Sequence, residues 1–426
     1  MRSMFERFKS FGLVAVSAGL VAALLLGSVV PAKAAEERVV KVGLRAIFTG
    51  PLATFGTPVY TGLIDGARYV NEQRGINGIK ISTPWYDTRA EIPRGIMAHK
   101  RLKEEGVVME IDIVCGIIDT LAPAQQRDEI PLLGYQAYTS PGALTKPVPW
   151  IFLPVSEWEN TMFDQLKALN ASWGEERPLK FGMFIHDLPD ARALVEGAKR
   201  YAPEIGIDFV GYEVIPFLGA IDTSVEWLRL MSKKPDWVYV MAFGSTFVTM
   251  AKDAARLEAR EKGIKCMAGP FCADERTLKV TGKDTEGWYS VLLGPTNLET
   301  DVPGVRTVIE YAKRYRGYEP TDVPCTYLVA SAVMKIAAGI IELAIEKVGF
   351  ENLTGRAVRD VMGSGIIKDF DTDGMLPPVS MSDTQPWYVN KLRFCIIKEG
   401  RQVPWGPWFD VTAEHYPEWF QEALYK

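Results

Sequence analysis

The sequence predicts an α/β fold in which parallel sheets are covered by helices on both faces. Short apolar runs alternate with longer stretches of helical periodicity along most of the chain, which is the pattern of parallel-sheet proteins. The order of these segments also divides into two similar halves. Residues 36–153 make one α/β unit, and residues 154–291 repeat its architecture without repeating its sequence. We therefore expect two Rossmann-like lobes.

Strands are expected where a short apolar or β-branched run is bounded by turn residues. These runs are Val39–Ile47, Ile79–Tyr86, Ile111–Cys115, Leu179–Ile185, Asp208–Val214, Trp237–Met241 and Lys265–Ala268. The first helix is expected directly after the first strand: Thr57 can cap it, Pro58 suits its first position, and Arg74-Gly75 ends it. Later helical patterns cover Ile92–Glu105, Trp158–Leu169, Ala191–Tyr201, Ser224–Met231, Thr246–Ala259, Val305–Arg316 and Tyr327–Lys347.

The chain beyond residue 291 is too short for a third α/β domain. Its helices between Val305 and Val361 and its strands near Val389–Ile397 are expected to complete the first two lobes. We therefore assign residues 36–153 and about 292–381 to lobe 1, and residues 154–291 and about 382–426 to lobe 2. A chain that crosses several times between two lobes forms a hinged clamshell, and ligands of α/β sheets bind beyond the carboxyl ends of the strands.

Residues 1–34 have the composition of an export signal. Arg2, Arg7 and Lys9 precede the apolar run Phe11–Val30, and Pro31–Ala34 then offers small residues at the positions that a signal peptidase reads. We expect cleavage after residue 34 and a periplasmic protein. An uncleaved anchor is the alternative, because about 20 apolar residues can just span a bilayer.

The length, composition and net charge of the chain indicate a globular protein and disfavour nucleic-acid binding. The 426 residues suffice for two or three domains, and 47% hydrophobic with 24% charged residues is ordinary for a globular protein. The formal net charge is −5, and removal of residues 1–34, which carry three net positive charges, makes it −8. An acidic protein of this kind is a poor binder of nucleic acid. Cys266 and Cys272 are the one close pair of cysteines, and both a disulfide and two free thiols are open for them.

The loop "FTGPLATFG", residues 48–56, is placed between the first strand and the first helix. It lacks the lysine of a phosphate-binding loop and the three glycines of a dinucleotide-binding loop. Instead it offers the apolar ring of Phe55 beside a turn, which suits a small organic solute. The alternative is a structural turn with Phe55 in the core.

Two further loops carry polar side chains after expected strands. Asp119 and Thr120 stand where a helix could begin, and helix N-termini bind anionic groups. Thr120 could equally be an ordinary helix cap. The segment "YQAYTSPG" offers Tyr138, Thr139 and Ser140. These side chains are candidate ligand contacts.

Enzymatic functions find little support in the sequence. His99, His186 and His415 are the three histidines, and each stands apart from the serine, cysteine or carboxylate partners that nucleophilic catalysis needs. Zinc-binding and serine-hydrolase motifs do not occur. We expect no catalytic residue, no cofactor and no metal site. An exported α/β enzyme stays an alternative that turnover of a bound solute would reveal, as does an exported receptor that serves a signalling partner.

The stretch Val40–Ile81 closely resembles the opening of the periplasmic leucine/isoleucine/valine-binding protein family, the type I solute receptors of ABC importers. Gly50-Pro51, Phe55-Gly56 and the turn Asn71–Gly78 stand in the places that the family pattern requires, with Arg74 in place of the first glycine of the turn. Weaker similarities follow along most of the chain, at Val114–Ala124, Ile185–Asp187, Trp237–Gly244, Cys266–Pro270 and Glu286–Tyr289.

This resemblance implies a type I periplasmic binding protein clamshell that closes around one small carboxylated molecule and delivers it to a membrane permease. In the family, hydroxyls and backbone amides of two loops of the first lobe hold the ligand's carboxylate. By rough alignment Thr120 and Ser140 would supply the hydroxyls, and Tyr138 an aromatic wall or a backbone contact.

The second lobe departs from the family pattern. Where the family has an aromatic residue in the loop from His186 to Asp190, this chain has Pro189; a second family aromatic falls on Phe243. Phe271 stands where amino-acid-binding members have a glutamate, and a buried ammonium group needs a charged partner. An aromatic box therefore favours an apolar or aromatic carboxylate. An α-amino acid stays open if one of four acidic residues turns inward: Asp119, Asp187, Asp190 or Asp274.

Overall fold

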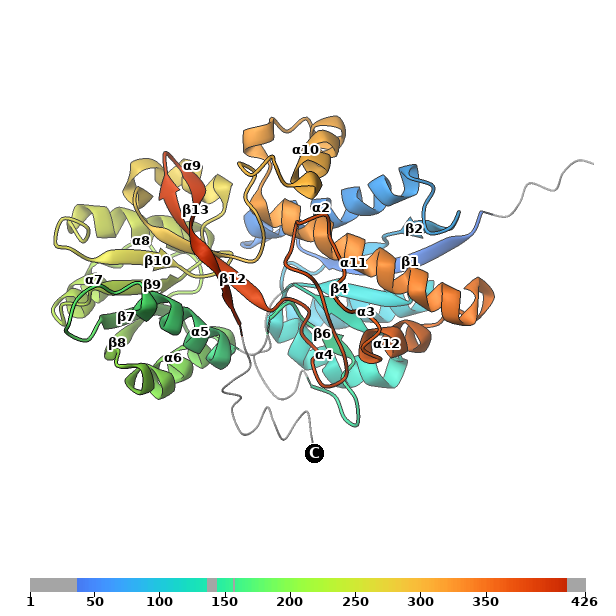
Figure 1. Cartoon of the computed structure of the whole chain (residues 1–426), viewed down its shortest axis with the longest axis horizontal. Coiled ribbons are helices and arrows are strands. Elements are labelled where there is room, and N and C mark those ends of the chain that lie inside the picture. The colour runs from blue at the N-terminus through green and yellow to red at the C-terminus, as the bar shows by residue number, and fades with distance from the viewer. Residues whose placement is uncertain (1–36, 136–143, 156–157, 412–426) are drawn as a thin grey trace, which may run out of the picture. The chain divides into compact units, whose positions relative to one another are not determined.

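The protein is described by a computed structural model that places residues 37–135, 144–155 and 158–411. Residues 39–426 form one compact unit, and the structural statements below concern its described part. Within this part the strands gather into two sheets, each covered by helices (Figure 1). The mixed α/β architecture expected from the sequence is confirmed.

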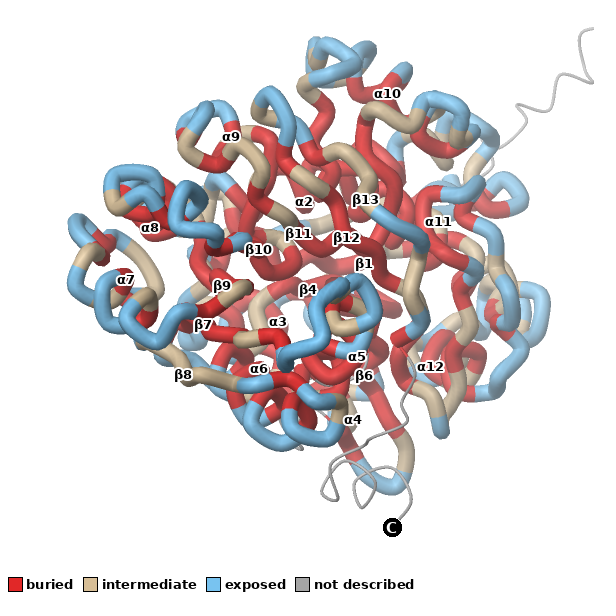
Figure 2. The backbone as a smooth tube through the Cα atoms, turned by 60° about the vertical axis from the view of Figure 1, so that its left-hand side comes forward, coloured by how far each residue is buried: buried red, intermediate tan, exposed pale blue. Residues whose placement is uncertain are grey.

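The first sheet is parallel throughout its described strands. These strands are β1 (Val39–Ala46), β2 (Lys80–Ser82), β3 (Trp85–Asp87), β4 (Met109–Asp112), β5 (Leu132–Gly134) and β6 (Ile151–Phe152). Their order is β2-β1-β4-β5-β6, and β3 pairs with β1 beyond the end of β2. The central strands β1 and β4 are almost wholly buried (Figure 2), although they carry the charged residues Arg45, Glu110 and Asp112.

The second sheet has the order β13-β12-β11-β10-β9-β7-β8. Its strands are β7 (Lys180–His186), β8 (Asp208–Ile215), β9 (Trp237–Met241), β10 (Lys265–Ala268), β11 (Tyr289–Leu292), β12 (Lys391–Lys398) and β13 (Arg401–Asp410). The first five of these run parallel, whereas β12 and β13 are antiparallel to their neighbours. The end of the chain thus completes a sheet begun more than a hundred residues earlier.

The helices connect successive strands and cover the sheets. They are α2 (Ala53–Glu72), α3 (Ile92–Glu105), α4 (Cys115–Asp128), α5 (Trp158–Ala171), α6 (Pro189–Tyr201), α7 (Ser224–Met231), α8 (Gly244–Arg256), α9 (Glu275–Thr281), α10 (Pro303–Arg316), α11 (Cys325–Val348) and α12 (Gly355–Gly363). Short 3-10 turns lie at Pro203–Ile205, Gly282–Thr285, Pro320–Asp322 and Phe350–Asn352. Helices α2, α4, α6 and α8 each follow directly on a parallel strand, which brings their N-termini to the carboxyl ends of the sheets.

Helix α11 is long and apolar enough to cross a membrane, and it is the one described helix with these properties. Most of its apolar stretch is buried inside the protein, which is the environment of a core helix. It packs along α2 (Figure 1). The approach is close because α2 presents Gly62, where a Cβ atom would lie 2.7 Å from the carbonyl oxygen of Tyr327.

Three of the expected boundaries were wrong. Helix α2 starts at Ala53, so Pro58 lies inside the helix instead of at its first position. The run expected as one strand from Ile79 is two strands, because it is broken before Trp85 by a proline, whose carbonyl accepts a hydrogen bond from Leu44 of β1. Residue Cys115 begins α4 and does not end a strand.

Strand β13 was not expected at all. It contains Pro404, Gly406 and Pro407, which are unfavourable in the interior of a sheet because proline has no N–H to donate. The strand is tolerated since it pairs only with β12 and therefore lies at the edge of the sheet.

Candidate functional site

Four helix N-termini converge on one pocket. The N-cap residues of α2, α4, α6 and α8 are Leu52, Val114, Leu188 and Phe243, and all four line it. The free space inside is about 650 Å³, part of which opens to solvent. We call this the N-cap pocket; its lining residues are Ile47, Leu52, Phe55, Ile113, Val114, Cys115, Gly116, Asp119, Leu188, Pro189, Asp190, Phe217 and Phe243.

The four N-cap side chains are apolar and none accepts a hydrogen bond from its own helix. The first N–H groups of a helix have no partner within the helix and carry a partial positive charge. In α2 the N–H groups of Ala53 and Phe55 already donate to the carbonyl oxygens of Gly50 and Leu52, and the first residue of α6, Pro189, has no N–H. The N-termini of α4 and α8 are therefore the main features of the pocket that favour an anionic group. The lining residues include no lysine, arginine or histidine, so among the described residues this backbone charge is the pocket's positive potential.

Aromatic rings form the apolar wall of the pocket. The ring centroid of Phe55 lies 6.1 Å from that of Phe243 and 6.0 Å from that of Phe271. Phe243 in turn contacts Phe217 at 6.0 Å. Phe55 comes from α2 and Phe243 from the N-terminus of α8, so the wall is assembled from helices that follow strands of different sheets. Ring pairs at these separations stabilise one another beyond simple burial.

The loop before Phe55 is fixed on both sides. The carboxylate of Asp87 accepts hydrogen bonds from the N–H groups of Phe48 and Thr49, at 3.1 and 3.4 Å. Gly56 packs so closely on β1 that a Cβ atom there would lie 2.4 Å from the carbonyl oxygen of Ile47. The second glycine of the loop is thus required by packing against the strand, and it places the Phe55 ring in the pocket.

Two carboxylates line the pocket, Asp119 of α4 and Asp190 of α6. Both oxygens of Asp190 lie 3.2 Å from Nε2 of the fully buried His186. The other ring nitrogen of His186, Nδ1, lies 3.2 Å from the carbonyl oxygen of Met241. The two ring nitrogens of His186 thus lie within hydrogen-bond distance of acceptors on both sides, the Met241 carbonyl and the Asp190 carboxylate, and the ring is held between them.

The other two acids considered in the sequence analysis lie elsewhere. Asp187 is exposed and pairs with Arg192. Asp274 is the N-cap of α9 and accepts hydrogen bonds from the N–H groups of Arg276 and Thr277. Neither lines the N-cap pocket, so among the residues that the structure describes Asp119 and Asp190 are the acids that line it.

Four of the residues expected to bind ligand meet in this pocket: Phe55, Asp119, Pro189 and Phe243. Phe271 does not line the pocket. Its ring centroid lies 6.0 Å from that of Phe55 and 5.1 Å from that of Tyr135. It lines a second, smaller pocket together with Glu275. Its φ of +67° is rare for a bulky side chain, so the backbone at this position is strained. Tyr138, Thr139 and Ser140 lie outside the described residues.

Thr120 was expected near a helix N-terminus, and this placement was wrong. Helix α4 starts five residues earlier, at Cys115, so Thr120 lies in its second turn. The side chain is exposed and its hydroxyl donates to the carbonyl of Gly116 at 2.7 Å. It does not line the N-cap pocket.

Sequence reasoning missed several lining residues. Cys115 was expected to end a strand and Gly116 was assigned no role, although their position directly after an apolar run could have indicated a helix start. Phe217 lies after β8 and carries no local signal for a site. The sequence did not decide whether Cys266 and Cys272 form a disulfide. In the structure both are free, buried thiols.

Comparison with known proteins assigns the family. Residues 39–398 match the family model described as periplasmic binding protein. The chain belongs to this family. Its members are periplasmic binding proteins, the solute receptors of ABC transporters, in agreement with the resemblance noted in the sequence. No curated protein matches the chain in sequence.

Solved structures of periplasmic binding proteins share the two-lobed type I fold. A branched-chain amino acid ABC transporter protein from Thermus thermophilus, with bound valine, is 19% identical with a TM-score of 0.78, covering 92% of this chain and 100% of that one. A solute-binding protein from R. palustris in complex with 4-hydroxybenzoate is 17% identical with a TM-score of 0.73, covering 88% and 98%. A leucine-binding protein from Thermotoga maritima is 17% identical with a TM-score of 0.68, covering 87% and 99%.

Proposed function

We propose that this periplasmic binding protein is the solute receptor of an ABC importer of the branched-chain amino acid type, and that it holds a small apolar α-amino acid in the N-cap pocket. One observation carries the proposal. Four uncapped helix N-termini, two carboxylates and an aromatic wall line the same space. An amino acid has one group for each of these three environments.

The carboxylate of the ligand belongs at the helix N-termini. Gly116 of α4 and Phe243 of α8 both line the pocket, so N–H groups from both lobes are within reach of one anionic group. A carboxylate held in this way needs no arginine or lysine, because backbone N–H groups and the helix dipole supply the charge.

The ammonium group of the ligand belongs at Asp190, and Asp119 lines the same pocket. Both carboxylate oxygens of Asp190 lie 3.2 Å from Nε2 of the buried His186. This arrangement would replace the family glutamate, whose position is taken by Phe271. A buried ammonium group without such a partner would cost several kcal/mol of binding free energy.

An apolar or aromatic carboxylic acid without an amino group is the second candidate. The observation that favours it is the aromatic wall of Phe55, Phe217 and Phe243, whose rings line the pocket and offer a flat ligand apolar contacts. Similar structures hold ligands of both classes, valine in one and 4-hydroxybenzoate in another.

A calorimetric panel separates the two candidates. L-leucine and 4-methyl-2-oxopentanoate differ mainly in the amino group, as do L-phenylalanine and phenylpyruvate. We expect each amino acid to bind at least about tenfold more tightly than its oxo acid, a difference of roughly 1.4 kcal/mol. Tighter binding of the oxo acids, or of 4-hydroxybenzoate, would favour the second candidate, and turnover of any of them would favour an enzyme.

The mechanism we propose is closure of two lobes around the ligand, followed by delivery to a membrane permease. Residues 36–153 with about 292–381 would form lobe 1, and residues 154–291 with about 382–426 lobe 2. The membership of β12 and β13 in the second sheet supports this division. Ligand contacts with both lobes would favour the closed state. Solution scattering should therefore give a smaller radius of gyration with ligand, and an unchanged radius with a saturating ligand would count against closure.

A further inference from the structure

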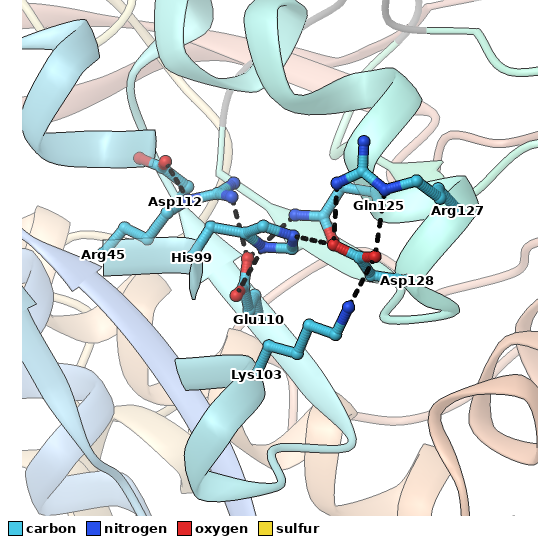
Figure 3. Close-up of polar contacts among 8 residues, drawn as sticks. All are labelled: Arg45, His99, Lys103, Glu110, Asp112, Gln125, Arg127 and Asp128. Carbon is cyan, nitrogen blue, oxygen red and sulfur yellow. Dashed lines mark hydrogen bonds and ion pairs between the residues drawn. The ribbon is translucent and has the colours of Figure 1, made fainter. Parts of the chain in front are cut away.

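Figure 3 shows a network of polar and charged side chains, which meets the N-cap pocket through the hydrogen bonds of Asp112 to Ile113 and Val114. At its centre Arg45 of β1 donates from Nη1 to Glu110 at 2.8 Å and from Nε to Asp112 at 2.6 Å. Glu110 and Asp112 both belong to β4, and the three side chains are completely buried. Burying charges is costly even when they are paired, so a network of this kind calls for a reason beyond stability.

The network continues on the Glu110 side towards the surface. Nδ1 of His99 lies 2.9 Å from Glu110, and Nε2 of Gln125 donates to the same carboxylate at 2.8 Å. Nε2 of His99 lies 3.2 Å from Asp128, which also pairs with Lys103 and Arg127 at the surface. In the described part of the chain, the carboxylate of Glu110 thus has side-chain partners, which come from helices α3 and α4 and from β1.

Asp112 differs from Glu110 in one respect: it bonds to the backbone. Its Oδ1 accepts hydrogen bonds from the N–H groups of Ile113 at 2.6 Å and Val114 at 2.9 Å. Ile113 and Val114 form the turn from β4 to α4, both line the N-cap pocket, and Val114 is the N-cap of α4. The Asp112 carboxylate thus accepts hydrogen bonds from the N–H groups of the turn. The side chain of the N-cap residue, Val114, is apolar and cannot accept any from the helix.

We propose that Asp112, held in place by Arg45, is a positioning residue of the N-cap pocket. Its carboxylate fixes the turn from which α4 presents Val114, Cys115 and Gly116 to the ligand. Arg45 orients the carboxylate through Oδ2 and leaves Oδ1 for the turn. The inference depends on the proposed function only for its effect on ligand binding, since the turn is held whether or not the ligand is an amino acid.

Asp112→Asn and Glu110→Gln form a matched pair of variants for the test. Each removes one buried negative charge beside Arg45, from the same strand. An asparagine cannot accept from both the turn and Arg45, because one of its two terminal atoms is a donor. Glu110→Gln has a comparable loss of charge but leaves the bonds from Asp112 to the turn intact.

The first measurement is amide hydrogen exchange of Ile113, Val114 and residues 115–118, relative to the amide of Leu44. Leu44 lies in β1 and its N–H donates to Pro84, so it reports unfolding of the lobe as a whole. We expect exchange in the turn to rise about tenfold or more relative to Leu44 in Asp112→Asn, as local opening becomes easier, and to change less than about threefold in Glu110→Gln. Equal effects in the two variants would overturn the proposal.

The second measurement is calorimetric affinity for L-leucine. We expect a loss of about tenfold or more in Asp112→Asn and of less than about threefold in Glu110→Gln. Unequal exchange with equal affinities would overturn the link to the pocket. If L-leucine does not bind the unaltered protein, the proposed ligand is wrong, and the exchange experiment still decides the role of Asp112.

A third variant keeps the proposal testable if Asp112→Asn does not fold. Arg45→Lys retains the buried positive charge but lacks the Nε donor that holds Oδ2 of Asp112. Faster exchange at Val114 than at Leu44 is the result expected of this variant. Exchange that rises equally at both amides would contradict a positioning role for Asp112.

Discussion

The rings of Phe55 and Phe243 lie 6.1 Å apart between their centroids, although one follows the first strand of the first sheet and the other follows β9 of the second. The aromatic wall of the N-cap pocket therefore exists only while residues from both sheets are together. A ligand that contacts this wall binds to a surface that neither sheet supplies alone, which is what a closing receptor requires.

Phe55→Ala should weaken ligand binding more than it weakens the fold. We expect the affinity for L-leucine to fall about tenfold or more, because the ring supplies a large apolar contact in the pocket. Calorimetry measures the effect. Phe48→Ala is the control, since Phe48 belongs to the same loop but packs on Tyr60 and Trp85 outside the pocket. Equal losses in the two variants would show that the loop matters and the Phe55 ring does not.

Asp190→Asn should discriminate between ligands. The affinity for L-leucine is expected to fall by about tenfold or more, since a hydrogen bond to a charged group contributes roughly 1.5–3 kcal/mol. The affinity for 4-methyl-2-oxopentanoate should stay the same or rise. Asp187→Asn, in an exposed acid outside the pocket, is the control and should alter neither. A parallel loss for both ligands would mean that Asp190 maintains the structure of the pocket and does not contact an ammonium group.

Gly56→Ala should destabilise the fold. The added Cβ would lie 2.4 Å from the carbonyl oxygen and 2.6 Å from the Cβ of Ile47, so α2 or β1 must shift. Overpacking of this kind costs about 1–3 kcal/mol of the free energy of unfolding. Gly116→Ala, also at a helix N-terminus, is the control because its nearest neighbour would be 3.8 Å away. Urea denaturation of both variants compares them, and equal stabilities would refute the packing argument.

Glu275 should make stability depend on pH. Burial raises the pKa of Glu275 from an ordinary value of 4.5 to about 7. The hydrogen bond that its carboxylate accepts from the N–H of Cys325 lowers the pKa and opposes this effect in part. Between these values the folded protein holds a proton that the unfolded chain has released. The free energy of unfolding therefore falls as pH rises from about 4.5 to about 7, by up to about 3 kcal/mol, and levels off above.

Glu275→Gln tests this dependence, because an amide does not titrate. Urea denaturation at pH 5 and pH 8 should show a smaller loss of stability in this variant than in the unaltered protein. Glu261→Gln is the control, since Glu261 is exposed and should leave the pH dependence unchanged. A Glu275→Gln protein that loses as much stability as the unaltered one would place the pKa of Glu275 near its ordinary value.

The N-terminus of the secreted protein is expected near Ala35. Small residues at Ala32 and Ala34 frame the expected cut. N-terminal sequencing of the protein from the periplasm measures the site directly. Recovery of a chain that begins at Met1 from the membrane fraction would support an uncleaved anchor instead.

Strands with strong local patterns could be predicted from the sequence almost to the residue. Trp237–Met241 and Lys265–Ala268 were expected and observed with the same bounds, because each is an apolar run between clear turns. The start of α4 could not be predicted in this way. Its N-cap, Val114, has no capping side chain, and the turn before it depends on Asp112, whose orientation is set by Arg45 about 70 residues earlier.

The candidate site was predictable where topology alone decides it. Phe55 and Asp119 follow strands of the first sheet, whereas Pro189 and Phe243 follow strands of the second. Each lies beyond the carboxyl end of a parallel strand, and all four line the N-cap pocket. The position of Phe271 was not predictable, because its backbone is left-handed and its ring, 6.0 Å from that of Phe55, does not line the N-cap pocket. No local pattern forces a residue of that size into a left-handed conformation; the surrounding fold does.

The pairing of β12 with β11 affects how the chain can fold during its synthesis. Helices α10, α11 and α12 lie between these strands in sequence, so β7 to β11 leave the ribosome long before their last partners. An open sheet edge is prone to wrong pairing, and domains generally fold as units. Translation that stops before Lys391 should therefore yield a product that aggregates. The second sheet therefore cannot be complete until Asp410 has been made, which delays its folding relative to the synthesis of β7.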